Sequence, residues 1–229
     1  MIAASAHRLR AAPVGSAVLS RGGATVWFTG LPSAGKSTLA SGLAARLQVE
    51  GRQVEILDGD ELRRHLTADL GFSRQDRETN VRRVGFVARL LARHGVFALV
   101  PVIAPYQASR AAVRAEHAAE GIPFVEVHVA TPLSVCAARD VKGLYAKQQA
   151  GVLRGLTGVD DPYEEPQNPE LRLDTTGLTV AEAVDRVYAV LVQVMARSET
   201  PDLPITDQPR DTRVESDGLE PSAVGEGVQ

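Results

Sequence analysis

The stretch Gly30-Leu31-Pro32-Ser33-Ala34-Gly35-Lys36-Ser37 decides the fold of this chain of 229 residues. It fits the phosphate-binding loop pattern G-x-x-x-x-G-K-[ST] at every fixed position. In such a loop the backbone N–H groups point inward at phosphate oxygens, the lysine reaches the β- and γ-phosphates, and the serine hydroxyl holds Mg²⁺. We therefore expect residues 30–38, Thr38 included, to bind ATP together with Mg²⁺. The pattern does not identify the group that receives the phosphate.

Apolar runs alternate with amphipathic helical patterns along the chain, which is typical of a parallel sheet covered on both faces. Strands are expected at Thr25–Thr29, Val54–Leu57, Val96–Ile103, Phe124–Val129 and Leu171–Asp174. One helix is expected at Ser37–Glu50 and another near Glu78–His94. A last helix opens with Thr179 and Glu182 at the spacing of a capping box. The predicted class is α/β, with a mostly parallel five-stranded sheet and helices on both faces.

The composition predicts one folded domain between two tails. The chain is 44% hydrophobic and 23% charged, and it is long enough to bury a sizeable core. We expect residues 1–22 to be a flexible extension, 23–197 the domain, and 198–229 a disordered acidic tail. The tail has eight acidic residues against two arginines, four prolines and few large apolar residues, a composition that cannot bury a core.

Several classes of protein are disfavoured by the composition. No apolar run is long enough to span a membrane, and the first residues lack the apolar segment of a secretory signal. Cys136 is the only cysteine, so no disulfide can form within the chain, and a reducing cytoplasm fits. The formal charge is −3 and the arginines are spread over many elements, which disfavours nucleic acid as a partner.

Two carboxylates follow the second expected strand, in the sequence Asp58-Gly59-Asp60. Phosphoryl transfer to a hydroxyl needs a carboxylate that orients or deprotonates the nucleophile. The third expected strand carries no carboxylate, so Asp58 or Asp60 is the candidate for this work. We expect Gly59 to let the backbone turn tightly between them, and a plain Asp-Gly turn without a catalytic role is the alternative.

A cluster of cations with one aromatic residue follows the carboxylates. It contains Arg63, Phe72, Arg77 and Asn80. Arginines suit an anion and an aromatic ring suits a purine, so the cluster is compatible with an anionic acceptor that contains a purine. An ordinary charged helix face is the alternative.

Lysine is rare in this chain: of 25 cationic residues only Lys36, Lys142 and Lys147 are lysines. An ammonium is a compact point charge, whereas a guanidinium is a bulky planar fork. The two lysines around Gly143-Leu144-Tyr145 therefore indicate a segment that contacts phosphate or substrate, with two ordinary surface lysines as the alternative.

Further motifs follow the loop in order. They are Leu57-Asp58-Gly59-Asp60, Asp69-Leu70-Gly71-Phe72-Ser73, Asp76-Arg77, Asn80-Val81-Arg82-Arg83-Val84-Gly85, Pro105-Tyr106, Val135-Cys136, Arg139-Asp140-Val141-Lys142-Gly143-Leu144-Tyr145 and Thr157-Gly158-Val159-Asp160-Asp161-Pro162-Tyr163-Glu164. Together they resemble the adenylylsulfate kinase (APS kinase) family, whose members phosphorylate the 3′-hydroxyl of adenosine 5′-phosphosulfate (APS) to PAPS. The resemblance covers residues 23–197 and implies a P-loop kinase fold with a mobile lid.

The resemblance also implies site residues. The catalytic group would be Asp60, Lys36, Asp58 and Lys142, and the metal ligands would be Ser37 and Asp60. ATP would be held by Gly30, Leu31, Pro32, Ser33, Ala34, Gly35, Lys36, Ser37, Thr38 and Arg139, the last near the adenine. The acceptor would be held by Arg63, Phe72, Arg77, Asn80, Ile103, Lys142 and Leu156. A homodimer is implied, with APS supplied by a separate ATP sulfurylase in sulfate activation.

The sequence departs from the family pattern at three positions. Ala104 stands where the family has a serine described as phosphorylatable, so no mechanism through a phosphoserine at this position is possible. Leu156 stands for a phenylalanine that stacks on the acceptor adenine, which removes roughly 0.5–1.5 kcal/mol of aromatic contact. Gln149 stands where the lid often has arginine. These changes leave two alternatives open, a diverged P-loop kinase for another nucleotide or small metabolite, and a catalytically idle nucleotide-binding protein.

Overall fold

The computed structural model describes residues 22–198, and within this range five strands form one sheet. They are β1 (Ala24–Thr29), β2 (Val54–Ile56), β3 (Phe97–Pro101), β4 (Phe124–Val129) and β5 (Leu171–Leu173). Their order is β2-β3-β1-β4-β5, and every neighbouring pair is parallel. The predicted five-stranded sheet is confirmed. The expected tails, 1–22 and 198–229, lie outside the described residues except for Gly22 and for Ser198, which ends helix α7.

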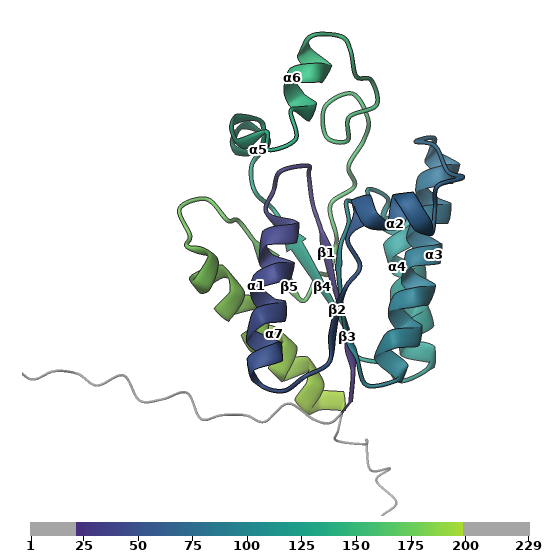
Figure 1. Cartoon of the computed structure of the whole chain (residues 1–229), viewed down its shortest axis with the longest axis vertical. Coiled ribbons are helices and arrows are strands. Elements are labelled where there is room, and N and C mark those ends of the chain that lie inside the picture. The colour runs from purple at the N-terminus through teal and green to yellow at the C-terminus, as the bar shows by residue number, and fades with distance from the viewer. Residues whose placement is uncertain (1–21, 199–229) are drawn as a thin grey trace, which may run out of the picture.

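Helices cover both faces of the sheet (Figure 1). Helices α1 (Lys36–Val49) and α7 (Val180–Ser198) cover one face, and α3 (Arg74–Arg93) and α4 (Gln107–Ala119) cover the other. Successive side chains of β1 point to opposite faces of the sheet, so this strand contributes to the core on both faces. Val26 and Phe28 pack with α1 and α7, whereas Trp27 packs with α3 and α4. No helix in residues 22–198 is long and apolar enough to cross a bilayer.

The ends of two elements differ in how well the sequence predicts them. The capping box of α7 is confirmed, because the Glu182 N–H donates to Thr179 Oγ1 (3.2 Å) and the Thr179 N–H donates to Glu182 Oε2 (2.9 Å). Strand β3 is shorter than the expected Val96–Ile103. It ends at Pro101, and three residues later Ala104 has a φ of 45°, which lies in the left-handed region.

Three short helices lie near the carboxyl ends of the strands (Figure 1): α2 (Gly59–His65), α5 (Leu133–Arg139) and α6 (Leu144–Gln149). The expectation of a tight turn at Gly59 is wrong. Asp58 Oδ1 accepts the Asp60 N–H (3.0 Å) and caps α2, and Gly59 has no positive φ. A carboxylate that satisfies a free N–H of a first turn starts a helix there, so Asp60 lies in that first turn.

Helices α3 and α4 approach each other closely at Gly85. A Cβ atom added to Gly85 would lie 2.6 Å from Cγ2 of Val113 on α4. We expect Gly85→Ala to lower the free energy of unfolding by about 1–3 kcal/mol, since overpacking outweighs the better helix propensity of alanine. Denaturant titration checks this value.

The matched control is the same change in a Val113→Ala background. There the two shortest contacts are gone and only Cβ of residue 113, at 3.3 Å, stays close, so Gly85→Ala should cost clearly less than in the native background. Equal losses in both backgrounds would contradict the close approach.

Candidate active site

One cavity of about 610 Å³ is lined by residues that follow the strands at their carboxyl ends. Ligands on open parallel sheets bind at this edge. The cavity brings together expected residues from five places in the chain, namely Pro32, Ser33, Gly35, Lys36, Ser37, Thr38, then Asp58 and Asp60, then Arg63, Phe72, Arg77 and Asn80, then Ile103, and finally Arg139 and Lys142.

The ammonium of Lys36 lies inside the phosphate-binding loop. Its Nζ donates to the carbonyls of Gly30 (2.9 Å) and Leu31 (2.7 Å). Burial lowers the pKa of Lys36 to about 8, because removal from water disfavours the charged form. An arriving phosphate would favour the charged form again, so the loop is arranged to receive an anion.

Two further carbonyls of the loop are bound from outside it. Tyr145 of α6 donates its hydroxyl to the carbonyl of Pro32 (3.0 Å). The carbonyl of Ala34 accepts from three side chains at 3.0–3.3 Å, those of Thr131, Thr175 and Arg139. Since donors from other segments bind these carbonyls, the loop conformation that offers N–H groups to an anion is stabilised.

The two carboxylates after β2 have different partners. The Ser37 hydroxyl lies 3.4 Å from Asp58 Oδ2, whereas Asp60 forms an ion pair with Lys142 across the cavity. No group of three or more His, Cys, Asp or Glu side chains suited to a metal occurs among residues 22–198. A hydroxyl beside one carboxylate does suit Mg²⁺, which is held by few protein oxygens together with phosphates and water.

Phe72 marks the other end of the cavity. Its side chain is 69% exposed, and the Arg63 guanidinium lies 4.3 Å from the ring centroid. Burial, and then the nearby charge of Arg77, lower the pKa of Arg63. A guanidinium beside another cation favours an anion, and an exposed ring favours a planar group.

Arg77 is buried and mostly bound to protein. It donates to the carbonyls of Phe72 (2.9 Å) and Gly155 (2.8 Å) and to the Thr157 hydroxyl (2.8 Å), and it pairs with Asp161 (3.1 Å). In this structure the side chain therefore joins α3 to the segment that follows α6.

The family of the chain follows from its relatives. A family model described as adenylylsulphate kinase matches residues 22–174. An adenylyl-sulfate kinase of Synechococcus sp. (strain JA-3-3Ab) is 53% identical over 173 residues, which cover 76% of this chain and 96% of the relative. The chain belongs to the adenylylsulfate kinase family.

Solved APS kinase structures agree with this assignment. The APS kinase CysC of Mycobacterium tuberculosis, in complex with AMPPNP and APS, has a TM-score of 0.72 and 47% identity, covering 75% of this chain and 99% of that one. A hexameric APS kinase from Thiobacillus denitrificans has a TM-score of 0.59 and 45% identity, covering 76% of this chain and 29% of that one.

Some residues expected to bind ligand in this APS kinase family member do not line the cavity. Leu156 is only 5% exposed and belongs to the larger hydrophobic core cluster. Its contact with an acceptor therefore stays a prediction, and it requires the lid to move. Gly30, Leu31 and Ala34 lie behind the cavity and hold Lys36, Thr131, Thr175 and Arg139 by their carbonyls.

Sequence reasoning did not foresee how the loop is braced. The sequence places Thr175 among the residues that end the fifth strand, where site residues are expected, but it gives no sign of the bond from the Thr175 hydroxyl to the Ala34 carbonyl. The hydroxyl of Tyr145 gave no comparable signal, because its contact with Pro32 spans a sequence separation of 113 residues.

The lowered pKa of Lys36 predicts a pH dependence of stability. The folded chain releases this proton near pH 8, and the unfolded chain near the ordinary value of 10.5. Between these values the unfolded state binds more protons, so the free energy of unfolding rises with pH. We expect the difference in this free energy between the native protein and Lys36→Met to grow from about pH 7.5 to 9.5.

Chemical unfolding without nucleotide at several pH values measures this difference. The exposed Lys147→Met variant is the control and should track the native protein. A pH-independent difference for Lys36→Met would contradict the lowered pKa.

Proposed function

We propose that this chain transfers the γ-phosphate of ATP to the 3′-hydroxyl of APS, giving PAPS and ADP. One observation carries the proposal: a single cavity holds the phosphate-binding loop, two carboxylates beside it, and a ring with two guanidiniums at one end. That arrangement offers sites for a triphosphate, a nucleophilic hydroxyl and an anionic purine nucleotide. Membership of the APS kinase family supports the same reaction.

ATP occupies the side of the cavity next to β4 and β5 in this proposal. The loop N–H groups and Lys36 bind the phosphates. Arg139, which is fixed by the Thr175 hydroxyl at 2.9 Å, lies beside the adenine. Thr38 lines the cavity at the start of α1 and completes the nucleotide site.

APS occupies the side next to β2 and β3. Phe72 stacks on its adenine, and Arg63 and Arg77 attract its phosphosulfate. Asn80 has its amide oxygen fixed by the Thr67 hydroxyl at 2.9 Å, which leaves the amide N–H groups to donate to the ribose or phosphosulfate. Ile103 lines the wall between these groups and the loop.

Asp60 orients the 3′-hydroxyl and takes its proton as the oxygen attacks the γ-phosphorus. The bond to the β–γ bridging oxygen breaks, and ADP leaves. Lys142 shifts from Asp60 to the transferring phosphate, whose charge it neutralises. Both side chains line the same cavity and contact each other, so this exchange of partners requires only local movement.

Mg²⁺ fits beside Ser37 and Asp58, whose side-chain oxygens approach each other, and Asp60 is a further candidate ligand. When bound there, the ion neutralises charge on the β- and γ-phosphates. Asp58 also caps α2, so it fixes the position of Asp60 at the same time.

Direct transfer needs no phosphoserine. Ala104 is buried in the cavity wall and carries no hydroxyl. Residues 140–160 form a lid in this proposal, and its closure would exclude water that otherwise takes the phosphate.

The cellular setting belongs to the same proposal. The enzyme would work in the cytoplasm as a homodimer in sulfate activation, with APS from a separate ATP sulfurylase. Its only cysteine, Cys136, is free and buried, which is compatible with a reducing compartment.

The proposal is tested by APS-dependent release of ADP in the presence of Mg²⁺. Asp60→Asn should lower kcat by about 10²–10⁴-fold, because it removes the proton acceptor. Glu61→Gln is the matched control, since Glu61 is an exposed neighbour on α2 that does not line the cavity.

The choice of acceptor is tested by assaying adenosine, AMP and sugars beside APS. A preference for any of them over APS would replace this function with that of another P-loop kinase.

The ring of Phe72 should contribute to acceptor binding. Phe72→Ala is expected to raise KM for APS by about tenfold and to leave KM for ATP unchanged, since one aromatic face is lost. Phe86→Ala is the control, because Phe86, like Phe72, is exposed, but it lies on α3 outside the cavity. Steady-state kinetics with each substrate varied decide the matter, and equal effects of both variants would remove Phe72 from the acceptor site.

A further inference from the structure

The wall of the cavity after β3 is held by hydrogen bonds to three consecutive backbone carbonyls. The Ile103 carbonyl accepts from the Thr29 hydroxyl of β1 (2.6 Å). The Ala104 carbonyl accepts from Arg110 Nη1 of α4 (2.6 Å), and the Pro105 carbonyl accepts from the Glu164 N–H (2.8 Å). Three separate segments therefore hold one stretch of backbone that lines the cavity.

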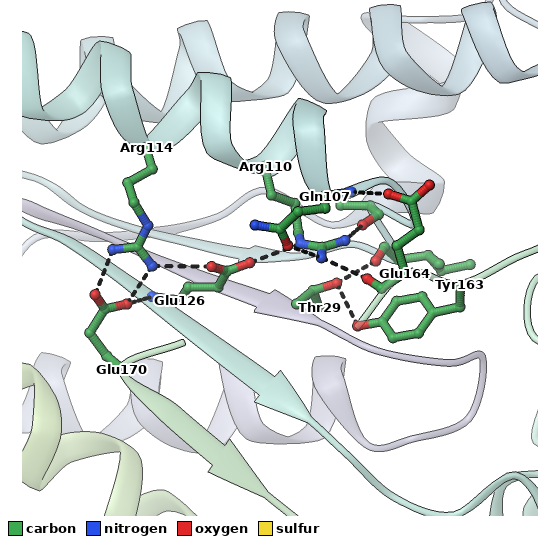
Figure 2. A network of polar contacts seen from close by, with 10 residues as sticks. Thr29, Gln107, Arg110, Arg114, Glu126, Tyr163, Glu164 and Glu170 are labelled. Atoms are coloured by element: carbon green, nitrogen blue, oxygen red, sulfur yellow. Dashed lines mark hydrogen bonds and ion pairs between the residues drawn. The ribbon is translucent and has the colours of Figure 1, made fainter. Parts of the chain in front are cut away.

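Arg110 joins two of these segments through one guanidinium (Figure 2). Besides Ala104, its Nη2 donates to the carbonyl of Glu164 (2.6 Å) and to Gln107 Oε1 (2.7 Å), and its Nε donates to Glu126 Oε1 (2.9 Å). The residue is 1% exposed. A planar fork with fixed N–H directions can bind such diverging acceptors at once, whereas a lysine ammonium cannot reach all of them.

Glu164 is tied to the same wall a second time. Its Oε2 accepts the Gln107 N–H (2.7 Å) at the start of α4. Residues 162–164 follow Thr157 and Asp161, which contact Arg77, so Glu164 lies where the chain leaves Arg77 and returns toward the sheet.

Ala104 has a backbone conformation that needs support from its surroundings. Its φ of 45° lies in the left-handed region, which is unfavourable for an alanine. Such a conformation persists only where the surroundings fix it. The Arg110 bond to its carbonyl and the burial of its side chain are the surroundings that the structure provides.

Arg114 provides an internal comparison on the same helix. It pairs with Glu126 (3.1 Å) and Glu170 (2.8 Å), as Figure 2 shows. Neither glutamate lines the cavity. Both arginines thus share one buried carboxylate, but only Arg110 contacts the cavity wall.

We propose that Arg110 is a positioning residue for acceptor binding, because it fixes residues 103–105 and the returning chain at Glu164. The inference rests on the proposed function. β3 lies between β1 and β2 in the sheet, so this wall adjoins the carboxylates and the Phe72 end of the cavity, away from Arg139.

Arg110→Lys keeps the charge beside Glu126 and removes the fork. We expect KM for APS to rise by about tenfold or more and KM for ATP to change less than about twofold, since misplacing one wall disturbs one substrate. Arg114→Lys should leave both values within about twofold at a similar loss of melting temperature. An unchanged KM for APS in a folded Arg110→Lys variant, or an equal rise in Arg114→Lys, would overturn the inference.

Amide hydrogen exchange without substrate provides a readout that does not need activity. Arg110→Lys should speed exchange at the amides of Gln107 and Glu164, and Arg114→Lys should not. Unchanged exchange at both amides in Arg110→Lys would overturn the inference. If the native protein does not turn over APS, the proposed function fails, and the exchange result alone decides whether Arg110 holds the wall.

Arg110→Met combined with Glu126→Gln covers the case in which Arg110→Lys does not fold. This pair leaves no unpaired buried charge, and the glutamine still accepts from Arg114. The same rise in KM for APS and the same faster exchange are expected, and their absence counts against the inference.

Discussion

The site depends on the direction in which the phosphate-binding loop turns its peptide groups. N–H groups can face an anion only if the carbonyls of the loop find donors elsewhere. Here Lys36 binds two of them, Tyr145 binds the carbonyl of Pro32, and three side chains bind that of Ala34. The donors to Pro32 and Ala34 come from α5, α6 and the loops after β4 and β5. The conformation of the phosphate-binding loop therefore depends on these segments.

The strand order distributes the rest of the chemistry around that loop. β1 is the central strand, so the loop that follows it has β3 and β2 on one side and β4 and β5 on the other. Asp58, Asp60 and the wall at residues 103–105 lie on the first side, and Arg139 and Thr175 lie on the second. In the proposed reaction the two nucleotides would therefore share one cavity, with their reacting groups near Lys36.

Local and periodic features were predictable from the sequence, and contacts between distant segments were not. The loop, the five parallel strands and the Thr179–Glu182 capping box each rest on neighbouring residues. The prediction of a tight turn at Gly59 was wrong because the cap at Asp58 starts a helix instead. The bracing by Arg110 gave no signal in the sequence, since its partners Ala104, Glu126 and Glu164 become neighbours only after the sheet forms.

The most direct test of the account follows the phosphate itself. The native protein is incubated with Mg²⁺, APS and ATP labelled in the γ-phosphate, and the products are resolved by mass spectrometry and phosphorus NMR. The account predicts label on the ribose 3′-oxygen of the APS product, with one ADP formed for each labelled molecule. Label found in inorganic phosphate alone, or on another position of the acceptor, would contradict it.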